Sequence, residues 1–153
     1  MKNNCLFCSI VAGGIPSWNV FESEKHLAFL TPFPNTPGFT VVIPKQHLTS
    51  AIFSLEEKEY TELLTASREV AHLLERGLHC KRVAMIAEGM AIDHAHIKLI
   101  PLHGIPDGPW QPLLSNAPHF SEKYEGYLTT NDGPRMSDEE LSRIQGAILS
   151  ARK

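Results

Sequence analysis

The chain is poor in cysteine, in excess basic charge and in long apolar runs, which are typical of secreted, nucleic-acid-binding and membrane proteins, respectively. Its 153 residues include only three cysteines, and 14 basic residues face 17 acidic ones, for a formal net charge of −3. Three cysteines do not make a disulfide scaffold, and a net acidic chain has no basic surface for nucleic acid. No apolar run approaches a transmembrane length, and the N-terminal MKNNCLFC lacks the apolar segment of a signal peptide. We therefore expect a cytoplasmic protein that binds neither nucleic acid nor membrane.

Apolar residues at two different spacings predict an α+β fold. Short apolar segments at 18–21, 27–30, 39–43 and 83–87 are typical of strands. A longer segment opens with a capping box, Ser54-Leu-Glu-Glu57, and carries an apolar stripe at helical spacing as far as Gly77, where we expect the helix to end. Burying this stripe requires a sheet. The sequence thus predicts an antiparallel β-meander with one long helix.

The chain changes character after residue 103. We place a first domain at 1–103 and treat 104–153 as a proline-rich arm followed by a C-terminal helix. A second capping box, Ser137-Asp-Glu-Glu140, predicts the start of that helix. The tail is too short for a core of its own, so it must pack on the first domain or across a dimer interface. One strand is expected at 124–130, and Trp110 is either a packing residue or part of a lid over a pocket.

The most informative stretch is His94-Ala95-His96-Ile97-Lys98-Leu99-Ile100-Pro101. Read with a period of two, His94, His96 and Lys98 fall on one face and the apolar residues on the other. This is the pattern of a half-buried strand that a proline ends. Same-face neighbours lie roughly 6–7 Å apart, so two imidazoles and one ammonium form a single row.

This row of side chains has two interpretations. It is either the solvated face of an edge strand or a binding site. Three metal ligands are disfavoured, because Lys98 would place an ammonium beside the metal. Phosphate fits better, since lysine binds it as a point charge and a neutral imidazole can attack phosphorus.

Three motifs resemble those of the histidine triad (HIT) family of nucleotide hydrolases and transferases. HAHIKLIP is similar to the family's H-x-H-x-H pattern, with Lys98 at the third histidine. TPGFTVVIPKQH, at 36–47, is similar to P-G-H-x-L-V-I-P-K-x-H, and CLFC, at 5–8, resembles the C-x-F-C of the zinc-containing branch. The motifs follow the family's order. The resemblance implies a HIT-like fold for residues 1–103, a nucleotide substrate and a homodimer.

The resemblance also implies a structural zinc ion. Cys5 and Cys8 would provide two ligands, and His47 and His94 the other two. Such a Cys2His2 set is tetrahedral and leaves no open position for water. Taken alone, the two cysteines are also compatible with core residues or a redox dithiol. A thioredoxin-type motif, however, needs a preceding strand, for which four residues leave no room. His47 taken alone is compatible with a solvated loop residue.

The same resemblance makes His96 the nucleophile, which would accept a nucleotidyl group through a neutral ring nitrogen. Lys98 would keep a positive charge at the scissile phosphate, and Thr31 stands where the family has Asp or Asn for the ribose hydroxyls. The segment Glu88-Gly89-Met90-Ala91-Ile92-Asp93 replaces a loop whose Gln and Ser hold phosphate oxygens. Gly89 is its candidate phosphate-binding residue, whereas Glu88 and Asp93 add negative charge there.

We therefore expect a HIT-like nucleotidyl hydrolase or transferase with a covalent nucleotidyl-His96 intermediate. Its substrates would be nucleoside phosphoramidates, dinucleoside polyphosphates or similar nucleotides. The missing loop donors and Lys98 favour a second hypothesis, a zinc-stabilised nucleotide-binding module with little or no turnover. A third hypothesis, a hydrolase that uses the histidines as catalytic metal ligands, is disfavoured because two cysteine ligands indicate a closed site.

Overall fold

A computed structural model describes residues 4–105, 107–109 and 135–151. The predicted strand at 124–130 and Trp110 lie outside these residues. The elements, in chain order, are α1 (Leu6–Val11), β1 (Trp18–Glu22), β2 (His26–Leu30), β3 (Thr40–Pro44), the 3-10 helix η1 (Ile52–Ser54), α2 (Glu57–Leu78), β4 (Val83–Ile86), β5 (Ile97–Pro101) and α3 (Asp138–Ser150). No helix among the described residues is both long and apolar enough to cross a bilayer.

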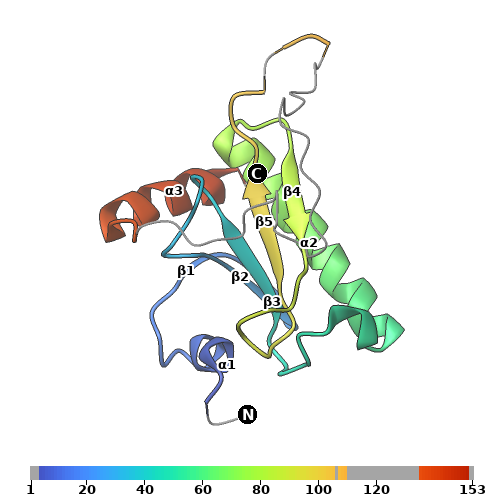
Figure 1. The fold of residues 1–153 in the computed structure, drawn as a ribbon. Coiled ribbons are helices and arrows are strands. Elements are labelled where there is room, and N and C mark those ends of the chain that lie inside the picture. Colours follow the sequence, from blue (N-terminus) through green and yellow to red (C-terminus); the bar gives the residue numbers. More distant parts are fainter. Residues whose placement is uncertain (1–3, 106, 110–134, 152–153) are drawn as a thin grey trace, which may run out of the picture.

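The strands form one sheet in the order β1-β2-β3-β5-β4, and each neighbouring pair is antiparallel (Figure 1). The predicted α+β class and antiparallel sheet are therefore confirmed. The first three strands form a meander. Helix α2 then carries the chain to the far edge, where β4 pairs with β5 and places β5 beside β3. Lys98 of β5 is consequently flanked by Val41 and Ile86.

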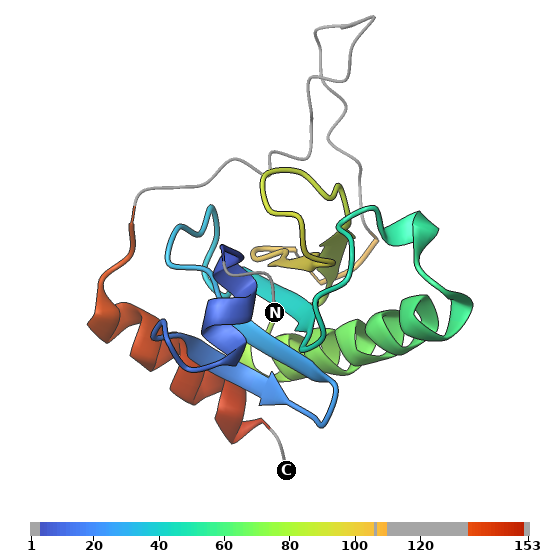
Figure 2. The ribbon, with the colours of Figure 1, turned by 90° about the horizontal axis from the view of Figure 1, so that it is seen from below.

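Both faces of the sheet are buried, because alternate residues of each strand enter different clusters. Ala28 and Leu30 pack with the apolar residues of α2 and α3, whereas Leu27 and Phe29 pack with Phe7 of α1. Figure 2 shows α1 on one side of the sheet and the two longer helices on the other. The short α1 thus covers the sheet face on which the polar residues of the HAHIK stretch lie.

The ends of α2 differ from the sequence prediction. Glu56 is its N-cap residue and makes no side-chain cap bond. Ser54 belongs to η1, where its hydroxyl donates to the carbonyl oxygen of Ala51 at 2.7 Å. The predicted capping box at Ser54 is therefore wrong. The helix also continues through Gly77 and ends at Leu78, before His79 in the left-handed region at φ 52°.

Gly77 lies inside α2 because α3 crosses it there. A Cβ atom at residue 77 would lie 2.5 Å from the Cα of Ile148 and 2.9 Å from the carbonyl oxygen of Ala147. Real Cβ atoms do not make such contacts. The glycine thus permits close helix packing and does not end the helix.

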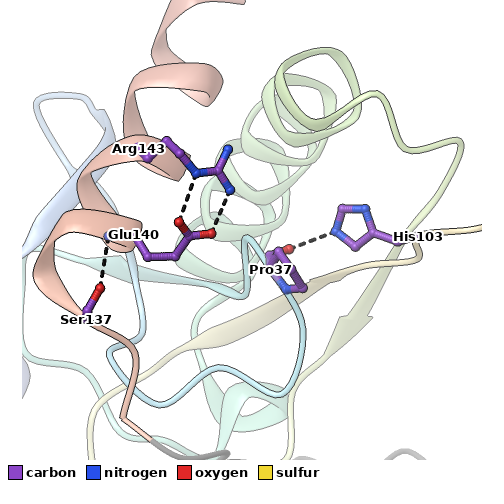
Figure 3. Close-up of polar contacts among 5 residues, drawn as sticks. All are labelled: Pro37, His103, Ser137, Glu140 and Arg143. Carbon is purple, nitrogen blue, oxygen red and sulfur yellow. Dashed lines mark hydrogen bonds and ion pairs between the residues drawn. The ribbon is translucent and has the colours of Figure 1, made fainter.

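Helix α3 begins where the sequence predicts. The hydroxyl of Ser137 accepts a hydrogen bond from the backbone N–H of Glu140 at 3.2 Å, and Arg143 pairs with the carboxylate of Glu140 (Figure 3). Its buried face packs on α2 and β1. Figure 3 also shows the imidazole of His103 joined to the carbonyl oxygen of Pro37 at 2.9 Å, which ties the segment after β5 to the loop before β3. The division of the chain at residue 103 stays a prediction.

Candidate active site and metal centre

The four predicted metal ligands come together from three separate segments. Cys5 is the N-cap of α1 and Cys8 lies one turn later. His47 follows β3, and His94 lies shortly before β5. Their ligand atoms all lie within 4.8 Å of one another. The cluster is therefore able to hold a metal ion.

The distances within this cluster fit a tetrahedral zinc ion. Nδ1 of His94 lies 3.4 Å from Sγ of Cys5 and 3.6 Å from Sγ of Cys8. Nδ1 of His47 lies 3.4 Å from Sγ of Cys8. Bonds of about 2.3 Å to sulfur and about 2.0 Å to nitrogen at a tetrahedral angle place a sulfur and a nitrogen ligand about 3.5 Å apart. These three sulfur-to-nitrogen distances are close to those of a tetrahedral zinc site.

The orientation and tautomer of the His94 ring leave Nδ1 able to bind a metal ion. Its Nε2 lies 2.9 Å from the carbonyl oxygen of Pro44, to which it donates a hydrogen bond, so that Nδ1 carries the lone pair. The side chain is fully buried, and this burial is the main cause that lowers the pKa of His94. The imidazole is therefore held neutral, as a metal ligand must be.

His96 lies immediately before β5, which begins at Ile97 and not at His94 as the alternation predicts. Its Nδ1 lies 2.7 Å from the carbonyl oxygen of His94 and donates to it, so Nε2 carries the lone pair. The ring packs edge-on against Phe7, with centroids 5.5 Å apart. Burial is the main cause that lowers the pKa of His96, and the charge of Lys98 lowers it further. A neutral imidazole in a fixed orientation has the properties of a nucleophile.

The imidazole of His96 lines a cavity of about 650 Å³ on the α1 side of the sheet. This volume suits a ligand of nucleotide size. The polar side chains in its wall include those of Thr31, Glu88, His96 and Lys98. Most of the wall is apolar and includes Leu6, Phe7, Ile10, Trp18, Phe33, Phe39 and Ile92. The cavity thus combines a mostly apolar wall with a few polar side chains, one of which is His96.

Lys98 and Glu88 form an ion pair in the wall of this cavity. Lys98 is paired in register with Ile86 at the end of β4, and Glu88 follows two residues later. The side chains are 18% and 27% exposed, respectively. The structure therefore agrees with the expectation of a negative charge here, and it adds that the carboxylate contacts Lys98 directly. The pairing could not be predicted from the sequence, because it depends on the path of the loop.

The remaining candidates differ in position. Thr31 lines the cavity, and its hydroxyl accepts a hydrogen bond from the N–H of Phe33 at 3.3 Å. Gly89 is not among the described residues that line the cavity. It has φ +69°, and a Cβ there would lie 2.4 Å from the carbonyl oxygen of Ser50. Asp93 also faces Ser50, from whose N–H its carboxylate accepts a hydrogen bond at 3.2 Å. Asp93 is not among the described residues that line the cavity, and its carboxylate connects the loop to Ser50.

Phe7 is the main site residue that the sequence analysis did not single out. Its ring lies edge-on to both His94 and His96, at 5.7 and 5.5 Å between centroids. It is buried and also lines the cavity. Its position between Cys5 and Cys8 was the available signal, since a metal that holds both cysteines must also fix the residue between them.

Comparison with known proteins agrees with this geometry. The family model described as "HIT domain" matches residues 12–105. "Protein hit" of Bacillus subtilis (strain 168) is 34% identical over 110 residues, which cover 69% of this chain and 75% of that protein. "Adenosine 5'-monophosphoramidase hnt1" of Schizosaccharomyces pombe is 31% identical over 100 residues, which cover 64% of this chain and 74% of that protein.

The fold also matches a solved structure. A zinc-bound histidine triad family protein from Mycobacterium smegmatis superposes with a TM-score of 0.68 and 19% sequence identity, over 97% of this chain and 92% of that chain. The fold, the matched residues and the ordered motifs agree with one another. The chain therefore belongs to the HIT domain family.

Proposed function

We propose that the protein is a nucleotidyl hydrolase or transferase with a covalent nucleotidyl-His96 intermediate. The observation that carries the proposal is the His96 ring: it is oriented through Nδ1 by a backbone carbonyl and lines a cavity of nucleotide size. Its substrates would be nucleoside phosphoramidates, dinucleoside polyphosphates or similar nucleotides. A relative named as an adenosine 5'-monophosphoramidase supports this reaction class.

The proposed reaction has two displacements at phosphorus. The lone pair of Nε2 of His96 attacks the α-phosphorus, and the bond from phosphorus to the leaving nitrogen or oxygen breaks as the leaving group takes a proton from solvent. Water, or another acceptor, then attacks the same phosphorus, the bond to Nε2 breaks to release the nucleotide, and the proton of the attacking group returns to solvent. Lys98 would stabilise the charge on the phosphoryl oxygens, because its ammonium lies on the same side of the strand as His96.

We also propose that the metal is a structural zinc ion held by Cys5, Cys8, His47 and His94. The sulfur-to-nitrogen distances near 3.5 Å support this, and four protein ligands make a closed site. Zinc would supply a cross-link between α1 and the sheet. Because Leu6, Phe7 and Ile10 of α1 line the cavity, that cross-link would hold one wall of the substrate site.

A second candidate function is a nucleotide-binding module with little or no turnover. Two observations favour it: Lys98 is held by Glu88, and residues 88–93 carry no hydroxyl or amide side chain to stabilise a phosphoryl transition state. The two functions differ in what His96 does. In the enzyme it forms a bond, whereas in the module it only shapes the pocket.

Turnover and binding, measured together, separate these functions. The wild-type protein and His96→Asn are incubated with adenosine 5'-phosphoramidate and with diadenosine polyphosphates, and product formation is followed. We expect turnover by the wild type and a loss of roughly a thousandfold or more in His96→Asn. The control is His72→Asn, an exposed histidine on α2, which should keep full activity. Nucleotide binding without turnover in the wild type would establish the module instead.

We propose further that the protein is a cytoplasmic homodimer, as the family resemblance implies. Strand β4 lies at the edge of the sheet, and Met85 on it is 55% exposed. Sheet edges with exposed apolar residues are commonly covered by a partner. Analytical ultracentrifugation should give twice the chain mass, and Met85→Lys should shift the protein towards the monomer.

A further inference from the structure

Glu88 is a negative charge in a cavity that we propose for an anionic substrate. We infer that Glu88, through its ion pair with Lys98, selects substrates by the charge of their leaving group: neutral or cationic groups are accepted, and polyphosphate groups are disfavoured. This inference rests on the proposed function and narrows its substrate class. It concerns a residue that the three family motifs do not include.

The charges of the cavity wall favour this selection. Among the described residues that line the cavity, Lys98 and Glu88 are the only ones with a formal charge when His96 is neutral. They contact each other directly, so the part of the wall that the structure describes has no net charge. A nucleotide bound at His96 would bring one negative charge on the reacting phosphate, which Lys98 can match.

The charge of the leaving group then determines whether it is repelled or attracted by the carboxylate of Glu88. A polyphosphate would bring further negative charges, and the described wall has no second cation to match them. It would also place these charges near a carboxylate, and like charges in a partly buried site are costly. An amine on the leaving group would instead contact Glu88 while Lys98 contacts the phosphate. The ion pair of Lys98 with Glu88 is then replaced by one ion pair of each side chain with the ligand.

Glu88 is held near the site by the fold. Its neighbour Gly89 lies so close to the backbone of Ser50 that a Cβ would be 2.4 Å from the Ser50 carbonyl oxygen. Further along the same loop, Asp93 accepts a hydrogen bond from the N–H of Ser50. These two contacts anchor the loop to the segment before η1. The backbone of Glu88 is thus held beside the cavity, where its carboxylate reaches Lys98.

Binding of three matched ligands tests the inference. They are phosphodiesters of adenosine 5'-monophosphate whose second ester group is aminopropyl, propyl or carboxyethyl, so that size is kept and charge changes. Titration calorimetry is done with the zinc-loaded wild type, Glu88→Gln and a control, Glu62→Gln. Glu62 also pairs with a lysine, Lys25, and its side chain is 34% exposed, but it lies outside this cavity.

We expect the wild type to bind the aminopropyl ester at least about tenfold more tightly than the carboxyethyl ester, with the propyl ester between them. Glu88→Gln should reduce this ratio to about twofold, mainly by tighter binding of the carboxyethyl ester. Glu62→Gln should keep the wild-type ratio. Glu88→Ala provides the same comparison if the glutamine variant does not fold.

The inference is wrong if the ratio is the same in the wild type and the Glu88 variants, if the wild type shows no preference, or if none of the three esters binds. Its failure can be told from failure of the proposed function. A charge preference that depends on Glu88 in a protein with no turnover would support the selectivity and reject the enzyme. Turnover through His96 without that preference would support the enzyme and reject the selectivity.

Discussion

Nδ1 of His96 lies 2.7 Å from the carbonyl oxygen of His94, so the backbone of a candidate metal ligand orients the candidate nucleophile. The side chain of His94 meanwhile lies in the Cys and His cluster. One residue thus connects the two parts of the site. A second connection is Phe7, which packs on both rings. We therefore expect the metal centre to support both the stability of the fold and the position of His96.

Removing a metal ligand should release zinc and destabilise the protein. Cys8→Ser is expected to lower the zinc content from about one ion per chain to near zero, and the free energy of unfolding by several kcal/mol, because metal binding is coupled to folding. Elemental analysis and urea unfolding measure the two effects. Cys80→Ser is the control, since Cys80 is buried but is not part of the cluster. Equal zinc content in both variants would rule out the assigned ligand set.

The crossing of α2 and α3 predicts opposite effects for two glycine substitutions. Gly77→Ala places a methyl group against the backbone of Ile148 and should destabilise the fold by roughly 1–3 kcal/mol. Gly146→Ala, on α3, meets no atom within 4 Å and should stabilise the protein by about 0.5–1 kcal/mol, because alanine favours a helix. Thermal unfolding compares them. The packing account fails if both substitutions shift the melting temperature in the same direction.

His26 should make the fold sensitive to mild acid. Burial lowers the pKa of its imidazole in the folded protein; Glu62 and Glu69 raise the pKa and Lys25 lowers it, but burial has the largest effect. The unfolded chain therefore binds the proton more strongly. The stabilisation is complete above the ordinary value of 6.5 and is lost as the pH falls from there towards the folded pKa.

Replacing His26 measures this contribution. His26→Gln should lose less free energy of unfolding than the wild type when the pH is lowered from about 7.5 to about 5.5. Acid also protonates the metal ligands, but both proteins share that effect, so the difference between them isolates His26. Parallel pH dependence in the two proteins would show that His26 is not held neutral.

The elements predicted correctly from the sequence are those that local pattern determines. Short apolar segments predicted the strands. Ser137 with Glu140 predicted the start of α3, because such a cap depends on four consecutive residues. Ser54 has the same local pattern, but its hydroxyl bonds to Ala51 in a 3-10 turn. Gly77 lies within α2 because of α3, which is distant in sequence. Local pattern therefore predicts the existence of an element better than its ends.

The site, too, has residues that could be predicted from the sequence and contacts that could not. Family motifs fix the residues of the metal cluster and His96, so their meeting in space could be predicted. The ion pair of Glu88 with Lys98 and the contact of Asp93 with Ser50 depend on how one loop is folded against another segment. The packing of Phe7 on His96 depends on how α1 lies across the sheet. Such contacts between distant segments are not encoded in any short motif.

The most direct test of the account is to trap the covalent intermediate. The zinc-loaded protein is mixed with adenosine 5'-phosphoramidate, quenched within the first turnover and analysed as intact protein and as peptides by mass spectrometry under conditions that preserve phosphorus–nitrogen bonds. We predict a mass increase of one adenylyl group, located on His96 and lost in His96→Asn. Turnover without any adduct, or an adduct on a different residue, would contradict the claim that His96 attacks phosphorus.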